Sequence, residues 1–312
     1  MSIIEDMSMS KISIIGTGNL GSCIAYTLAE RRLCNELVLI DAIRELAEGN
    51  ALDITQAIAA KNDIRNDIRI QACEYKDIEG SDIIVVAAGK ARSTEMKSRL
   101  ELMSFNAGII REIAEHIKQY APKSIIITVT NPVDVMNYMM YRSTGFDRSR
   151  IIGSGQELDS VRFRLIAARG RASDVEGYVM GEHGDSQVPV FSKLKQKGKY
   201  MILPQEEKEE VIEKCRNSST EVINRKGATV YGPANNTVNM IEAIIKDQRK
   251  LMMCSAVLDG EYGHAGLSIG VPAILGKKGI IKIEEWQLIN DEQKMFIDSV
   301  LKLKGYIREM YR

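Results

Sequence analysis

The chain has 312 residues, in which 42 lysines and arginines balance 42 aspartates and glutamates. This length suffices for one large or two modest domains, and the balanced charge gives no field that would favour nucleic acid or an anionic membrane as a partner. The five cysteines have no spacing typical of a metal or redox site, which predicts a reducing compartment. No apolar run reaches the ~20 residues that span a bilayer, and no signal-peptide pattern opens the chain. We therefore expect a soluble cytoplasmic protein.

The first half of the sequence alternates short apolar runs with helical patterns. Strands buried on both faces are expected at 12–15, 37–40, 83–86 and 125–129, with a weaker candidate at 68–72. Helices are expected at 19–31, 43–60, 99–120 and 133–141. This alternation predicts βαβ units and the doubly wound parallel sheet of a Rossmann fold.

After about Gly153 the regular alternation ends. Helices are expected at 156–168, 205–225 and 230–245, and strands near 176–180, 251–258 and 268–275. A last helix is expected from Asn290, because Asn290 and Gln293 have the spacing of a capping box. We predict an α/β protein with a dinucleotide-binding domain at 10–153 and a mixed α+β substrate domain at 154–312.

A glycine turn follows the first predicted strand. In Gly16-Thr17-Gly18-Asn19-Leu20-Gly21, Gly16 permits a tight turn, Gly18 lets a pyrophosphate approach the backbone, and Gly21 lets helix and strand pack closely. Asp41, at the end of the next strand, can accept hydrogen bonds from the adenosine ribose and repel a 2′-phosphate. The pattern predicts NAD binding, with two alternatives kept open: Asp41 as a simple helix cap, and some tolerance of NADP because Arg44 is near.

Three ionisable residues in the second half form a candidate catalytic set. Asp159 and Arg162 are three residues apart and share one face of a predicted helix, while His183 lies between glycines in a Gly-Glu-His-Gly-Asp string. An imidazole beside a carboxylate exchanges protons near neutral pH, and a guanidinium grips a substrate carboxylate. The alternatives are a surface ion pair for Asp159 and Arg162, and a buried histidine that satisfies a turn.

The sequence resembles the lactate/malate dehydrogenase family from about Lys11 to the C-terminus. Beside the glycine turn, the resemblance is carried by Ala47-Glu48-Gly49 with Leu52-Asp53, Thr128-Val129-Thr130-Asn131-Pro132, Leu158-Asp159-Ser160-Val161-Arg162, Gly181-Glu182-His183-Gly184-Asp185-Ser186, Lys226-Gly227-Ala228-Thr229 and Ile269-Gly270-Val271-Pro272. Several motifs in the same order make a chance match improbable.

The resemblance implies a role for each matching residue. His183 would protonate the oxo group of a 2-oxo acid as NADH delivers hydride, Asp159 would orient the imidazole, and Arg162 would bind the substrate carboxylate. Asn131 would hold the reacting oxygen and seat the nicotinamide, with a cis bond to Pro132. Further site residues implied by the family are Arg99, which would close over the substrate, Thr229, which would line the pocket, and Gly89, which would contact the cofactor.

The substrate is expected to depend on Arg92. The family position matching Arg92 is usually Gln in lactate dehydrogenases and Arg in malate dehydrogenases, and a second carboxylate needs a cationic partner when it is buried. Arg92 therefore favours malate. Lactate stays open, because Glu182 and Thr229 also occur in the lactate branch, and Ser93-Thr94-Glu95 lengthens the loop by one residue.

Two other classes are also kept open. A glycosidase that needs NAD and a divalent metal would want a Cys and a His placed as ligands, and no Cys lies beside His183 in the sequence. A non-catalytic nucleotide-binding module would not need the Asp159, Arg162 and His183 set. By resemblance we expect a homodimer or homotetramer that acts on a small 2-oxo or 2-hydroxy dicarboxylic acid and has no resident metal.

Overall fold

The structure is a computed structural model that describes residues 10–60, 68–90, 99–169 and 174–311. Its α-helices are α1 (Asn19–Glu30), α2 (Arg44–Ala59), α3 (Arg99–Tyr120), α4 (Val133–Thr144), α5 (Gln156–Ala167), α6 (Gln205–Lys226), α7 (Tyr231–Ile245) and α8 (Asn290–Met310). None of these helices, as far as the structure describes them, is apolar over a length that could cross a membrane.

The strands form one large sheet and one small one. The large sheet holds β1 (Lys11–Ile15), β2 (Glu36–Ile40), β3 (Arg69–Ala72), β4 (Ile83–Val86), β5 (Ile125–Thr128), β6 (Ile151–Gly153), β8 (Val179–Gly181), β9 (Gln187–Pro189), β12 (Lys250–Asp259), β13 (Ala265–Gly276) and β14 (Gly279–Ile283). The small sheet holds β7 (Val175–Glu176), β10 (Lys195–Gln196) and β11 (Lys199–Tyr200).

The predicted Rossmann arrangement is confirmed in the first half of the chain. The strands lie in the order β3-β2-β1-β4-β5-β6, all parallel, which is the order of a dinucleotide-binding doubly wound sheet. The weaker candidate strand at 68–72 is confirmed as β3. In such a sheet the ligand binds beyond the carboxyl ends of the strands, at the point between β1 and β4 where the strand order reverses.

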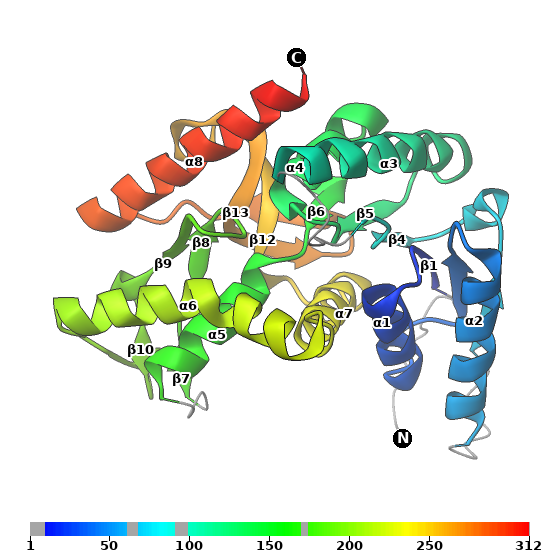
Figure 1. The fold of residues 1–312 in the computed structure, drawn as a ribbon, viewed down its shortest axis with the longest axis horizontal. Helices are drawn as coiled ribbons and strands as arrows, with labels where there is room; N and C mark the ends of the chain where they lie inside the picture. The colour runs from blue at the N-terminus through cyan, green and yellow to red at the C-terminus, as the bar shows by residue number, and fades with distance from the viewer. Residues whose placement is uncertain (1–9, 61–67, 91–98, 170–173, 312) are drawn as a thin grey trace.

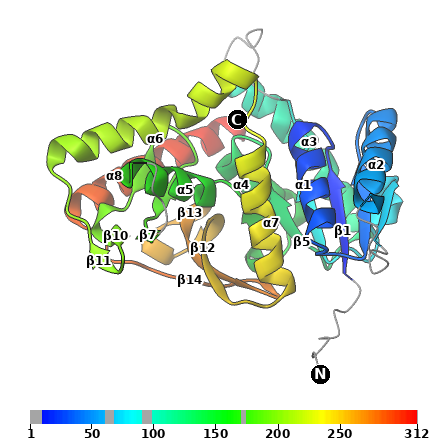
Figure 2. The same ribbon diagram turned by 90° about the horizontal axis from the view of Figure 1, so that it is seen from below.

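Alternate residues of each parallel strand face two separate cores. In β1, for example, Ile12 and Ile14 pack in one core, whereas Ile15 packs in the other, because successive side chains of a strand point to opposite faces. Helices α1, α2 and α7 cover the first face, and α3 and α4 cover the second (Figures 1 and 2). Helix α7 therefore belongs to the second half of the sequence but packs on α1 and the parallel sheet.

The large sheet continues into the second half of the chain. Strand β12 pairs antiparallel with β6, and β13, β8 and β9 follow in order. Helix α5 contacts β8 and β12, with α6 packed on α5, whereas α8 contacts β8, β9 and β13 on the other side (Figure 1). The division at residue 153 stays a prediction, since the two halves share a sheet and its cores.

Several element predictions were wrong in detail. The strand expected at 176–180 is two strands, β7 and β8, in different sheets. Strand β6 was missed because it has only three residues, of which two are isoleucines and the third is a glycine. Helix α4 extends to Thr144, where Gly145 adopts the left-handed conformation that ends a helix. The cap of α8 is Ile289, not Asn290, and the Glu292 carboxylate accepts the Ile289 N–H at 3.3 Å.

Candidate active site

His183, Asp159 and Arg162 lie together in the structure. His183 follows β8, and its Nδ1 lies 2.6 Å from Oδ2 of Asp159 in α5. Oδ1 of the same carboxylate accepts a hydrogen bond from the Arg162 guanidinium at 3.1 Å. The ion pair is not a surface pair, because Asp159 is only 2% exposed. Each carboxylate oxygen thus has one partner, and Nε2 of His183 has no hydrogen bond to any described residue.

The surroundings of His183 favour a protonated imidazole. Burial by itself lowers the pKa of His183, but the charge and hydrogen bond of Asp159 outweigh it, with a further contribution from Asp134, so that the pKa is raised above its ordinary value. Arg162 opposes this increase. A proton held on Nε2 near neutral pH is what a general acid needs.

Two residues that the sequence analysis missed contact His183 and hold the loop that carries it. Asp134, near the start of α4, accepts the His183 N–H at 2.7 Å and is 2% exposed. Gly155 lies directly against the imidazole, since a Cβ there would be 2.7 Å from Cγ of His183. No sequence signal identifies Asp134, because an acidic residue in the first turn of a helix is ordinarily a solvated partner of the helix dipole.

The glycine turn has the geometry predicted for a phosphate cradle. Gly16 has φ +95°, and a Cβ on Gly21 would overlap the Gly16 carbonyl oxygen. At Gly18 a Cβ would meet no atom within 4 Å, so the turn leaves open space, and no side chain caps the N-terminus of α1. Free amides and open space at a helix N-terminus fit a pyrophosphate.

Asp41 holds the glycine turn against the end of β2, and its role at the ribose stays a prediction. Its Oδ2 accepts the Thr17 N–H at 2.6 Å, which ties the end of β2 to the glycine turn, and its Oδ1 accepts the Ile43 N–H at 3.0 Å before α2. Asp41 is not the cap of α2, whose N-cap is Ile43 without a side-chain cap bond. Because Oδ2 also accepts the Thr17 hydroxyl at 3.2 Å, the lone pair that stays available to a ribose hydroxyl is on Oδ1. Arg44 contacts Glu48 and Glu74 at 2.8 and 3.3 Å, so its charge is shared with two carboxylates.

The start of the substrate loop is tied to Asn131. The peptide bond from Asn131 to Pro132 is cis, as predicted. Asn106, a buried residue of α3 that the sequence analysis missed, donates to the Asn131 carbonyl at 2.8 Å and accepts the Lys90 N–H at 2.8 Å. A Cβ on Gly89 would be 2.5 Å from Cγ2 of Thr130. These contacts place Gly89 and Asn131 side by side at the carboxyl ends of β4 and β5.

Two family models match almost the whole described chain. The NAD-binding domain of lactate/malate dehydrogenase matches residues 10–153, and the α/β C-terminal domain of the same family matches residues 156–312. The chain belongs to the lactate/malate dehydrogenase family. It is thus an NAD-dependent 2-hydroxy acid dehydrogenase.

Individual relatives include both branches of the family. The malate dehydrogenase of Natronomonas pharaonis is 39% identical over 301 residues, which cover 95% of this chain and 97% of the relative. Among solved structures, the apo malate dehydrogenase of Picrophilus torridus has a TM-score of 0.90 at 36% identity, covering 96% of this chain and 97% of that one. The minor L-lactate dehydrogenase of Enterococcus mundtii has a TM-score of 0.91 at 32% identity, covering 96% and 98%. Fold similarity therefore does not separate malate from lactate.

Three further site residues were predicted for this dehydrogenase: Arg92, Arg99 and Thr229. Arg92 lies outside the described residues, and Arg99 begins α3 but its side chain is also outside them. Thr229 lies half-buried in the connection between α6 and α7. The roles of these three residues stay predictions.

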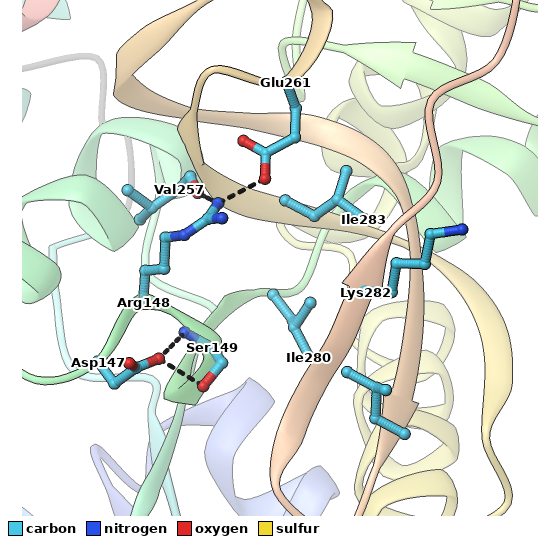
Figure 3. A pocket seen from close by; sticks show the side chains of 9 residues that line it. Asp147, Arg148, Ser149, Val257, Glu261, Ile280, Lys282 and Ile283 are labelled. Carbon is cyan, nitrogen blue, oxygen red and sulfur yellow. Dashed lines mark hydrogen bonds and ion pairs between the residues drawn. The ribbon is translucent and has the colours of Figure 1, made fainter.

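A pocket elsewhere in the dehydrogenase contains none of the predicted site residues. It has a volume of about 290 Å³ and lies between β12, β14 and the 3₁₀ turn at 148–150 (Figure 3). Arg148 projects into it and contacts Glu261 at 2.8 Å and the Val257 carbonyl at 3.0 Å, while Asp147 accepts from Ser149 (Figure 3). Because Arg148 bonds Glu261, which lies between β12 and β13, and the Val257 carbonyl of β12, we assign these contacts a structural role in holding the β12–β13 connection.

Proposed function

We propose that this dehydrogenase interconverts (S)-malate and oxaloacetate with NAD and NADH. The observation that carries the proposal is the buried group of His183, Asp159 and Arg162, with His183 Nδ1 held 2.6 Å from Asp159. This group supplies a proton donor and a carboxylate clamp for a 2-oxo acid. Two relatives, 39% and 37% identical to this chain, are named malate dehydrogenase.

The reaction follows from what each side chain can hold. Arg162 binds the carboxylate next to the reacting carbon, through the N–H groups of its guanidinium that Asp159 does not use. Nε2 of His183 donates a proton to the oxo oxygen, and Asp159 stabilises the imidazolium before the transfer and keeps the ring oriented. Asn131 donates to the same oxygen. The bound nicotinamide supplies the hydride.

The preference for malate rests on Arg92. Oxaloacetate carries a second carboxylate where pyruvate carries a methyl group, and a buried carboxylate needs a cation. Arg92 offers one in the part of the sequence that precedes α3. An arginine facing a methyl group would instead be desolvated without a partner, which disfavours pyruvate.

Parallel assays of NADH oxidation with oxaloacetate and pyruvate test the proposal. The wild type should prefer oxaloacetate, and Arg92→Gln should lose this preference by about a hundredfold or more, since a desolvated charge pair is removed. Lys97→Gln is the matched control, because it removes a positive charge from the same loop. A wild type that prefers pyruvate contradicts the malate assignment. A control that loses as much preference as Arg92→Gln contradicts the role of Arg92.

We also propose a cytoplasmic homodimer or homotetramer whose reaction is a step of the tricarboxylic acid cycle. The support for association is that Ile43, Leu46 and Leu52, on and beside α2, are large apolar side chains exposed to solvent, since exposed apolar surface can mark an interface with a partner. Sedimentation equilibrium of the wild type and of Leu52→Glu tests this proposal. A wild-type monomer at micromolar concentration would contradict it.

A further inference from the structure

Asp134 is a second buried carboxylate behind the catalytic histidine. Its Oδ2 accepts the main-chain N–H of His183 at 2.7 Å. Its Oδ1 accepts from Gln156 Nε2 of α5 at 2.8 Å and from Ser255 Oγ of β12 at 2.6 Å. The side chain therefore ties three elements to the residue whose imidazole faces the substrate.

The position is an expensive one for a negative charge. Asp134 is 2% exposed, and among the described residues no lysine or arginine forms an ion pair with it. Burial raises the pKa of Asp134 to about 6, although the hydrogen bonds from Ser255 and His183 act in the opposite direction. Neutral donors alone would be satisfied equally well by an amide or hydroxyl, so the carboxylate calls for a reason beyond packing.

The charges facing His183 come from each element packed on the loop. Asp159 and Arg162 face it from α5 and Asp134 from α4. In the loop itself Glu182 is buried and pairs with Lys302 of α8 at 2.8 Å. Arg162 pairs with Asp159, and Lys302 pairs with Glu182 and, at 3.8 Å, with the exposed Asp185 of the same loop. Among the described residues, Asp134 is therefore the carboxylate near His183 that no lysine or arginine offsets.

We propose that Asp134 is a positioning residue for proton transfer, which fixes the His183 main chain by a hydrogen bond and favours the protonated imidazole by its charge. The two actions are separable. The hydrogen bond sets where Nε2 points, whereas the charge sets the pH range in which Nε2 carries its proton. This inference rests on His183 being the proton donor of the proposed reaction.

Asp134→Asn isolates the charge, because the surroundings can accommodate an amide. Oε1 of Gln156 is buried and has no hydrogen-bond partner among the described residues. If the Gln156 amide turns over, this oxygen accepts from Nδ2 of the new asparagine, whose Oδ1 still accepts the His183 N–H. The Ser255 hydroxyl turns to become an acceptor. The loop is thereby kept in place while one negative charge is removed.

NMR titration of the imidazoles tests the charge directly. The chain has three histidines, so His183 can be resolved from His116 and His264 after isotope labelling. In Asp134→Asn the pKa of His183 should fall by about half a unit or more, and the signals of the other two histidines serve as internal references. Ser268→Ala is the control, because Ser268 Oγ bonds Ser255 and Asn137 in the same buried network but does not contact Asp134.

The same variants give a kinetic readout. Reduction needs a protonated His183, so in Asp134→Asn kcat/KM for the 2-oxo acid should decline at lower pH than in the wild type, by the same shift. An unshifted His183 titration, or an equal shift in Ser268→Ala, overturns the proposal. If Asp134→Asn does not fold, Ser255→Ala removes one donor to Oδ1 and should lower the pKa of His183 by a smaller amount.

Failure of the two proposals is distinguishable. A wild type that is inactive with every 2-oxo acid refutes the proposed function, while the titration of His183 still reports its coupling to Asp134. An active wild type whose His183 does not respond to Asp134→Asn refutes the positioning role alone.

Discussion

The glycine turn and the His183 loop are built by different means. At the turn, backbone shape makes the site: Gly18 leaves open space, and the amides of α1 have no side-chain cap. Around His183, ionisable side chains make the site, and Asp134 and Asp159 are both 2% exposed. The first arrangement costs little stability and binds a ligand that carries its own charge. The second holds charge out of water so that a proton can be transferred, which is costly.

The largest effect should come from the catalytic end. In His183→Asn, kcat should fall by about 10²–10⁴-fold, which is the usual contribution of a general acid. The dissociation constant of NADH should stay the same, because the glycine turn and Asp41 do not contact the loop. Stopped-flow turnover and NADH fluorescence titration measure the two quantities. His264→Asn, the matched control, should leave both unchanged, and undiminished turnover in His183→Asn would remove the basis of the mechanism.

At the glycine turn, stability and NADH binding should change when a substitution adds volume, even though it adds no charge. A Cβ at Gly21 would be 1.8 Å from the Gly16 carbonyl oxygen, so Gly21→Ala should lower the free energy of unfolding by about 3 kcal/mol. Gly18→Ala meets no atom, so it should change stability by less than about 1 kcal/mol. It should nevertheless weaken NADH by about tenfold, since the methyl group occupies the space of the pyrophosphate.

Urea unfolding and NADH titration of the two alanine variants make this comparison. If Gly18→Ala is as unstable as Gly21→Ala, the open space at Gly18 is not a ligand cradle. If both variants bind NADH as the wild type does, the turn does not hold the cofactor.

The same contrast explains how much the sequence could foretell. The glycine turn and Asp41 lie within one βαβ unit, where strand, turn and helix follow one another, so a local pattern predicted them. The residue types made His183 and Asp159, 24 residues apart, members of one candidate set, and the family resemblance gave each of them its role. Asp134 had no signal, because its burial depends on Ser255, 121 residues further along the chain.

Fold prediction failed at similarly non-local features. The strand β6 has three residues, and it is a strand because β5 and β12 lie on both sides of it. Helix α7 was predicted with nearly its observed bounds, but its place on the sheet of the first half was not. Periodicity identifies an apolar face and leaves open which surface covers it.

The cost of the buried charge predicts a pH-dependent stability. Because the folded protein raises the pKa of Asp134 from 3.8 to about 6, the native state holds this proton more tightly than the unfolded chain. Its contribution to folding is present at low pH and is lost as the pH rises through about 6. The free energy of unfolding of the wild type, relative to Asp134→Asn, should therefore fall by about 2 kcal/mol between pH 4 and pH 6.

Urea unfolding of both proteins across this range measures the difference, with Ser268→Ala to correct for general loss of packing. A difference that is constant with pH would mean that Asp134 is not desolvated in the native state. The buried charge of Asp134 would then not lower the stability of the folded protein, and the contrast in stability cost between the glycine turn and the His183 loop would be lost.

The smallest effect on stability should come from the ion pair that joins α8 to the residue before His183. Lys302 pairs with the buried Glu182 at 2.8 Å but is itself 28% exposed. After allowance for solvent screening, Lys302→Met should cost about 1 kcal/mol of stability. Lys294→Met, on the exposed face of the same helix, should cost less.

Because Glu182 precedes His183 and its N–H is held by Ser299 of α8 at 2.6 Å, Lys302→Met should also lower kcat a few-fold without changing the affinity for NADH. Equal kcat in the two lysine variants would mean that α8 does not help to position His183, which would then depend on α4, α5 and its own loop.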